Sequence, residues 1–339
     1  MKLAFSTLGV PGMPVRDVAR LAAASGYDGV ELRAHPEEPV HPGLAPAERA
    51  SAAGEFRRAG VAVLTVAGYV RVAEAGTDEP VLVGLRELVD LAHDLGAAHV
   101  RVFPGGGGPH GPEPDPEADA RAARRLAATA PYAAGRGVRL LLETHDSHRT
   151  GADVARVLGL VSTLALPPEP TAPPEPVSPP EPAKPVLPTP GPGQPGPPSR
   201  GPGLPAAPPA DPGLPAAPGT VTGRAAGPAA RRRAVGALWD VLHPWLGGEE
   251  PAATYAALAP HLGYVQVKDV ASVEDTTTLP LGAGTLPLAA CLAPLVRAGW
   301  DGWLCWEYEK RWYPRAADLP DLLGPAREHL LRLLRGARA

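Results

Sequence analysis

Short apolar runs alternate with longer stretches rich in Ala, Leu and Arg along most of the chain. The short runs contain few polar residues, which is typical of parallel strands that are buried on both faces. They predict strands at residues 2–7, 29–33, 61–66, 99–103, 138–143, 234–240, 264–268 and 302–307. The longer stretches predict helices at residues 15–25, 46–59, 80–96, 116–136, 151–160, 251–261, 286–298 and 317–334.

Strands that each precede a helix, in this number, predict an α/β fold of the (β/α)8 TIM barrel type. The alternative is a doubly wound open sheet, which normally carries a glycine-rich phosphate-binding turn after its first strand. Here the first turn, at residues 8–12, reads LGVPG and lacks the G-x-G-x-x-G pattern. The sequence therefore favours the barrel.

One segment departs from the alternation of strands and helices. Residues 167–218 hold 23 of the 46 prolines and repeat the hexapeptide GLPAAP. Because such a segment cannot bury enough apolar surface to offset its ordering entropy, we predict a largely disordered Pro/Gly/Ala-rich insertion at 164–229. It would interrupt a single barrel domain spanning 1–339, between the fifth helix and the sixth strand. A proline-rich docking tract, in a protein that acts as a non-catalytic scaffold, is the alternative.

The composition argues against several classes of protein. A net charge of −4 with scattered arginines provides no basic surface, so we expect no nucleic-acid partner. No apolar run reaches the roughly 18 residues that span a bilayer, so we expect no membrane partner, and the first residues resemble a strand rather than a signal peptide. The only cysteines, Cys291 and Cys305, cannot form a disulfide framework, which favours a cytoplasmic location.

Four consecutive predicted strands end in side chains that can bind a metal ion: Glu143, Asp240, Gln266 and Glu307. TIM barrels place their active sites at this end of the strands. Three carboxylates that meet there repel one another unless a cation lies between them. Oxygen donors suit Mn²⁺ or Mg²⁺, with Co²⁺ or Zn²⁺ as alternatives. Each acid could instead cap a helix or pair with an arginine.

These residues also carry a family resemblance. A glutamate on the fifth strand, Asp-x-x-His at 240–243, Gln-Val-Lys-Asp at 266–269 and a glutamate on the eighth strand resemble the xylose-isomerase-like sugar phosphate isomerase/epimerase superfamily. The resemblance covers nearly the whole chain outside the insertion. It implies that Glu143, Asp240, Gln266 and Glu307 bind the metal and that His243 contacts the substrate. Many epimerases of this superfamily have histidine in place of Gln266, but an amide oxygen can still bind a hard cation.

The resemblance implies a metal-dependent isomerase or epimerase of a sugar, sugar phosphate or related hydroxy-carbonyl compound. In such chemistry a divalent ion stabilises the enediolate that forms when a proton leaves the carbon beside a carbonyl. We assign the proton transfers to Glu143 and Glu307. A dehydratase or lyase of the inosose or 3-dehydroshikimate type is the alternative. Since superfamily members are often dimers or tetramers, a homo-oligomer is compatible with the resemblance.

A related barrel fold also serves apurinic-site endonucleases, which bind several metal ions. Those enzymes use histidines at the ends of the third and fourth strands as well. Here the third strand runs into Thr65-Val66-Ala67-Gly68-Tyr69 and the fourth ends Arg101-Val102-Phe103, without histidine. The sequence therefore argues against a nuclease.

Four further residues are candidate substrate contacts. Lys268 could hold a substrate oxygen, or it could pair with Glu307 or Asp269. Arg101 ends the fourth strand just before a run of glycines, which would allow a ligand to approach the backbone closely.

The other two candidates are His145, which could point into the barrel mouth, and Glu31. Glu31, near the end of the second strand, could position a substrate hydroxyl or pair with Arg33. The glycine-containing turn at 282–285 precedes a predicted helix, whose N-terminus could hold a phosphate or carboxylate.

Overall fold

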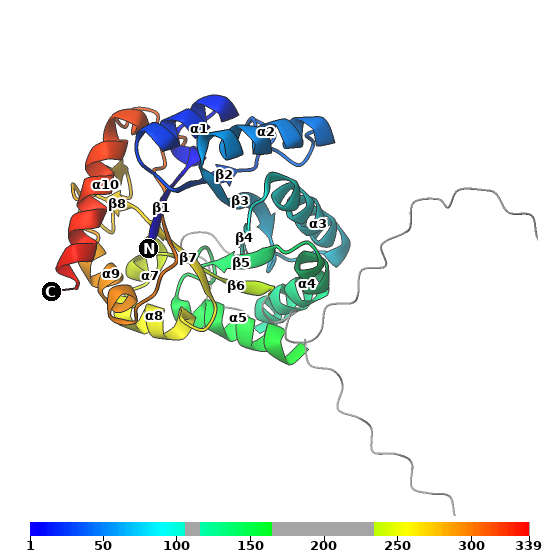
Figure 1. Cartoon of the computed structure of the whole chain (residues 1–339). Coiled ribbons are helices and arrows are strands. Elements are labelled where there is room, and N and C mark those ends of the chain that lie inside the picture. Colours follow the sequence, from blue (N-terminus) through cyan, green and yellow to red (C-terminus); the bar gives the residue numbers. More distant parts are fainter. Residues whose placement is uncertain (106–115, 165–233, 339) are drawn as a thin grey trace, which may run out of the picture. The chain divides into compact units, whose positions relative to one another are not determined.

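The computed structural model describes residues 1–105, 116–164 and 234–338. Eight parallel strands close into a barrel in the order β1-β10-β7-β6-β5-β4-β3-β2, with helices around the outside (Figure 1). The predicted TIM barrel is therefore confirmed. The strands of the barrel are β1 (Lys2–Ser6), β2 (Gly29–Arg33), β3 (Ala62–Arg71), β4 (His99–Phe103), β5 (Arg139–Glu143), β6 (Val235–Asp240), β7 (Leu262–Val267) and β10 (Trp303–Trp306).

Helices follow the strands along the chain as the sequence predicts. They are η1 (Thr7–Gly9), α1 (Val15–Ala24), α2 (Pro46–Ala59), α3 (Asp78–Leu95), α4 (Pro116–Gly135), α5 (Gly151–Leu164), α7 (Leu242–Leu246), α8 (Pro251–Leu258), α9 (Leu288–Arg297) and α10 (Leu319–Gly336). Two short helices, η1 and α7, are additional to the predicted ones. A short antiparallel pair, β8 (Asp269–Val270) and β9 (Thr278–Leu279), lies between β7 and α9 in the chain. No helix in the described ranges is long and apolar enough to cross a membrane.

The proline-rich segment falls between α5 and β6 in the chain, where the sequence places it. Apart from its first residue, Leu164, the predicted insertion at 164–229 lies outside the described residues. Its disorder and its docking role therefore stay predictions.

The largest difference from the predicted boundaries is in β3. The prediction ends at Val66, where Ala67 and Gly68 follow, and both residue types are uncommon in strands. In the structure β3 continues to Arg71, which is opposite Phe103 of β4 after a shift in register. This extension carries Tyr69 toward Arg101, whose guanidinium carbon is 5.6 Å from the centre of the Tyr69 ring.

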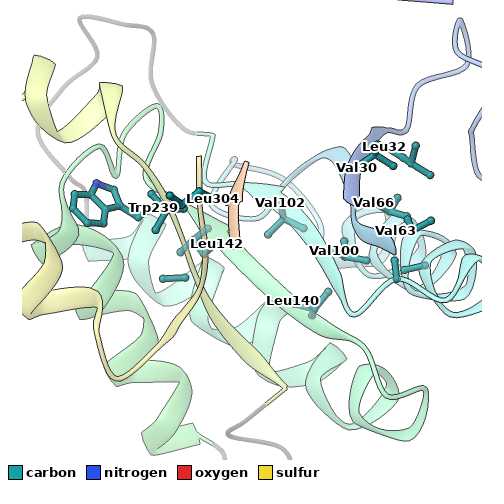
Figure 2. Close-up of a cluster of buried hydrophobic side chains, with 14 of the residues drawn as sticks. Val30, Leu32, Val63, Val66, Val100, Val102, Leu140, Leu142, Trp239 and Leu304 are labelled. Carbon is teal, nitrogen blue, oxygen red and sulfur yellow. The ribbon is translucent and has the colours of Figure 1, made fainter. Parts of the chain in front are cut away.

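Side chains alternate between the two sides of the barrel wall. On β2, Val30 and Leu32 belong to the large apolar cluster between the strands and the helices, part of which is drawn in Figure 2, whereas Glu31 lies between them in the sequence and faces inward. Inside the barrel a smaller apolar cluster fills the centre. It consists of Ala4, Leu64, Leu141, Leu238, Tyr264 and Cys305. Toward the carboxyl ends of the strands, the next inward positions are polar.

His99, at the amino end of β4, is a buried histidine that makes the stability of the barrel depend on pH. Burial lowers the pKa of His99 from 6.5 to about 4, and His99 Nδ1 lies 3.1 Å from the carbonyl oxygen of Leu64. In the unfolded chain His99 binds a proton below about pH 6.5, whereas in the folded protein it binds that proton only below about pH 4. This group should therefore lower the free energy of unfolding by roughly 3 kcal/mol as the pH falls through that window.

Urea unfolding at pH 7, 5.5 and 4.5 checks this prediction. The His99→Gln variant should lose less stability between pH 7 and 4.5 than the wild type, since glutamine does not titrate. Parallel curves for the two proteins would show that His99 does not cause the acid sensitivity.

Candidate active site

The polar inward positions form one layer at the carboxyl ends of the strands. Asp240 of β6 and Gln266 of β7 are opposite each other in the register. Each residue in this layer is at most 5% exposed. The layer contains these residues predicted from the sequence: Glu31, Arg101, Glu143, Asp240, Gln266, Lys268 and Glu307. The barrel thus brings these predicted residues together, because each lies near or just beyond the carboxyl end of its strand.

Lys268, directly after β7, lies among three carboxylates. Its Nζ is 2.7 Å from Asp240 Oδ2 and 2.8 Å from Glu309 Oε1, and it also contacts Glu307 Oε2. Burial alone would lower the pKa of Lys268, but the three carboxylates raise it well above its ordinary value. Lys268 therefore remains an ammonium ion, and it neutralises part of the acidic layer.

The structure decides between the two ion-pair partners suggested for Lys268. The pairing with Glu307 is confirmed, whereas a pairing with Asp269 is wrong. Asp269 instead accepts hydrogen bonds from the backbone amides of Gly282, at 2.8 Å, and Gly284, at 3.0 Å. The turn at 282–285 thus binds a carboxylate of this chain itself.

Arg101 is paired with Glu143 across β4 and β5. Its Nε lies 3.2 Å from Glu143 Oε2, and its guanidinium donates to the carbonyl oxygen of Gly68 at 3.0 Å. The guanidinium carbon is 4.0 Å from the centre of the Phe103 ring. Burial raises the pKa of Glu143 well above its ordinary value, although Arg101 counteracts it. Arg101 therefore contributes to the site by balancing the charge of Glu143.

Glu31 has different partners from those expected. It accepts hydrogen bonds from Tyr264 Oη at 2.5 Å and from Gln266 Nε2 at 2.9 and 3.0 Å. The suggested pairing with Arg33 is wrong, because Arg33 forms an ion pair with Glu38 at 2.5 Å. Glu31 is fully buried, and it accepts hydrogen bonds from the neighbouring side chains of Tyr264 and Gln266.

Two partly buried histidines lie beside Glu143. The ring centres of His145 and His243 are 4.0 Å apart, and His145 Nδ1 is 2.8 Å from Asp146 Oδ1. Asp146 has a φ of 46°, a conformation that non-glycine residues seldom adopt. Burial lowers the pKa of His243 well below its ordinary value, so its imidazole is neutral at pH 7.

The donor atoms of this site fit a divalent cation. Gln266 Oε1 is buried and has no hydrogen-bond partner among the described residues, which suits an oxygen that binds an ion. Ligand atoms of Glu143, His145 and His243 also lie within 4.8 Å of one another, the only such group of His, Cys, Asp and Glu in the described ranges. The other predicted carboxylates, on Asp240 and Glu307, are outside this group, and Lys268 lies between them.

Three residues of the site were missed as functional candidates. Tyr264 is two residues before Gln266 and Glu309 is two residues after Glu307, so strand alternation could have indicated that each shares the inward face. Asp146 gives no such signal, because its contact with His145 depends on the conformation of a loop.

The closed barrel of eight parallel strands places the chain among the TIM-barrel proteins. The chain belongs to the xylose isomerase-like TIM barrel family, whose sequence profile matches residues 19–167 and 229–333. No curated protein sequence matches the chain.

Solved structures with the same fold are distant in sequence. The probable 3-DHS dehydratase AsbF of Bacillus anthracis is 14% identical with a TM-score of 0.64, and the match covers 98% of this chain and 99% of that one. D-allulose 3-epimerase from Methylomonas sp., solved with D-allulose, is 14% identical with a TM-score of 0.60, covering 98% and 96%. The IolI protein, solved with a zinc atom, is 13% identical with a TM-score of 0.67, covering 99% of each chain. At these identities the likeness establishes the shared fold.

The ion pairs of Lys268 lead to a prediction about stability. Replacing Lys268 by Met leaves Asp240 and Glu307 buried without the ammonium group that pairs with them. In the presence of a metal chelator, this change should lower the free energy of unfolding by roughly 3–5 kcal/mol. Added Mn²⁺ should then raise the melting temperature of the variant more than that of the wild type, since the ion no longer competes with an ammonium group.

Lys310→Met is the matched control, because Lys310 pairs with Asp318, whose side chain is 74% exposed. Its loss should cost about 1 kcal/mol or less. If Lys268→Met unfolds at the same urea concentration as the control, the buried ammonium does not stabilise this layer.

Proposed function

We propose that this protein is a divalent-metal-dependent isomerase or epimerase of a sugar, sugar phosphate or related hydroxy-carbonyl compound. The observation that carries the proposal is the buried layer that holds Glu143, Asp240 and Glu307 together with Gln266, whose amide oxygen has no hydrogen-bond partner among the described residues. Glu143, Asp240, Gln266 and Glu307 would hold the ion. When bound, it would stabilise negative charge on a substrate oxygen next to the reacting carbon.

Glu143 and Glu307 are the proposed acid–base pair. Glu143 ends β5 and Glu307 directly follows β10, and these strands are separated by β6 and β7 in the barrel, so the two groups would approach a bound substrate from different sides. One carboxylate takes the proton from the carbon beside the carbonyl, and the other acid returns a proton. Return to the opposite face of the same carbon gives an epimer, and return to the neighbouring carbon gives an isomer.

Two positively charged side chains lie beside the proposed acid–base pair. Arg101 lies against Glu143 and Lys268 against Glu307, so each proposed acid–base group has a positive charge beside it. Although burial opposes them, Lys268 and Arg101 lower the pKa of Glu307, which favours the ionised form that accepts a proton. Burial raises the pKa of Glu143 well above its ordinary value despite Arg101, which favours the protonated form that returns a proton. The proposal is also in keeping with the fold, since the structural neighbours include D-allulose 3-epimerase and L-ribulose 3-epimerase.

A dehydratase is the second candidate, and the pair His145 and His243 favours it. Loss of water from a β-hydroxy ketone needs a base for the α-proton and an acid that protonates the departing hydroxyl. The neutral imidazole of His243, 4.0 Å from the ring of His145, could take the α-proton as the base, and Glu143, whose pKa is raised by burial, could protonate the departing hydroxyl. One structural neighbour is a probable 3-DHS dehydratase. A conjugated, ultraviolet-absorbing product would identify this reaction, whereas epimers and isomers lack that absorbance.

Hydrogen exchange with solvent tests the proposed acid–base pair. The purified protein with Mn²⁺ should introduce deuterium from D₂O beside the carbonyl of one compound in a panel of ketoses, inososes and hydroxy-ketoacids. Glu143→Gln and Glu307→Gln should each slow this exchange by about 100-fold or more, because the amide cannot accept the proton. Substrate binding should partly remain.

Glu328→Gln, at an exposed position of α10, is the matched control and should exchange at the wild-type rate. Full exchange activity in both Glu143→Gln and Glu307→Gln would rule out the assignment of these two residues.

A further inference from the structure

We propose that Glu31 is a positioning residue that orients the Gln266 amide so that its oxygen points toward the metal ion. This inference rests on the proposed metal site. An amide side chain has two different ends, and only its oxygen binds a cation. The ligand set therefore works only if something distinguishes the oxygen of Gln266 from its nitrogen.

The hydrogen bonds around Gln266 make this distinction. Nε2 donates to both carboxylate oxygens of Glu31, at 2.9 and 3.0 Å, and to Glu307 Oε1 at 3.2 Å. Oε1 has no hydrogen-bond partner in the part of the chain that the structure describes. Both N–H groups of the amide are thus used by acceptors, while the oxygen is left for a ligand.

The opposite orientation of the amide is strongly disfavoured. A flip would place Oε1 against the carboxylates of Glu31 and Glu307, and it would leave the NH₂ group buried without acceptors. A buried donor without a partner typically costs about 1–3 kcal/mol, and the repulsion between oxygens adds to that cost. Glu31 therefore selects one of two orientations that are otherwise similar in shape.

Glu31 is itself held in place. Tyr264 Oη donates to its Oε2 at 2.5 Å, and the side chains of Glu31, Tyr264 and Gln266 are all fully buried. Tyr264 and Gln266 are two residues apart on β7, so both point into the barrel toward β2. Residues hydrogen-bonded to a metal ligand commonly affect metal affinity in this way.

Mn²⁺ titration calorimetry on full-length variants tests the proposal. Glu31→Leu removes two of the three oxygens that accept from Gln266 Nε2 and should weaken Mn²⁺ binding by about 10-fold to 100-fold. Glu31→Gln removes the charge but keeps an acceptor oxygen for Gln266 Nε2, so it should bind Mn²⁺ more tightly than Glu31→Leu. If the charge of Glu31 alone mattered, the two variants would bind equally weakly, and that result would overturn the proposal.

A second substitution at residue 266 isolates the effect of orientation. In Gln266→Glu both ends of the side chain carry oxygen, so no orienting partner is needed. Adding Glu31→Leu to this variant should not weaken Mn²⁺ binding. An equal loss with either residue at position 266 would contradict the positioning role.

Thr65→Val is the control for a change in a buried polar side chain of the barrel. Thr65 is fully buried on β3, and its hydroxyl has no hydrogen-bond partner among the described residues, so Mn²⁺ affinity should stay unchanged.

If Glu31→Leu fails to fold, Tyr264→Phe provides a second variant. It removes the hydroxyl that holds Glu31 and should still weaken Mn²⁺ binding, and unchanged affinity in this variant would count against the proposal. A wild type that binds no Mn²⁺ would refute the proposed function as well, whereas equal binding by wild type and Glu31→Leu would refute only the inference.

Discussion

The burial of several carboxylates in one layer is the constraint on which the rest of the site depends. Glu31, Glu143, Asp240 and Glu307 are all at most 5% exposed. Burying a charge is costly unless a partner compensates it. Arg101 and Lys268 supply two positive charges in the same layer, which leaves an excess of acid. The proposed divalent cation is the simplest group that would balance this excess.

The barrel makes this concentration of charge achievable. Alternation along each strand sends Val30 and Leu32 to the helix side and Glu31 inward, so one strand supplies both packing and chemistry. An apolar cluster that includes Leu141 and Cys305 fills the barrel centre beneath the acids. The large apolar surface buried on both sides of the strands stabilises the fold, which allows the acidic layer to persist despite its electrostatic cost.

The sequence predicted the barrel and the members of the acidic layer because both follow from alternation within short strands. It could not predict which side chains meet across the barrel. Glu31 and Gln266 are 235 residues apart, and their hydrogen bond depends on closure of the sheet. For the same reason the predicted pairing of Arg33 with Glu31 was wrong, since the loop after β2 places Glu38 beside Arg33. Residue types at strand ends were informative, whereas the choice among neighbouring partners required coordinates.

Metal binding by the wild type and two variants tests the central claim most directly. After removal of bound metal, titration with Mn²⁺ should show about one ion per chain, and Asp240→Asn should bind it far more weakly because a carboxylate ligand is lost. His145→Ala should keep most of the affinity. The claim would be contradicted if the wild type bound no divalent ion, or if binding persisted in Asp240→Asn and disappeared in His145→Ala.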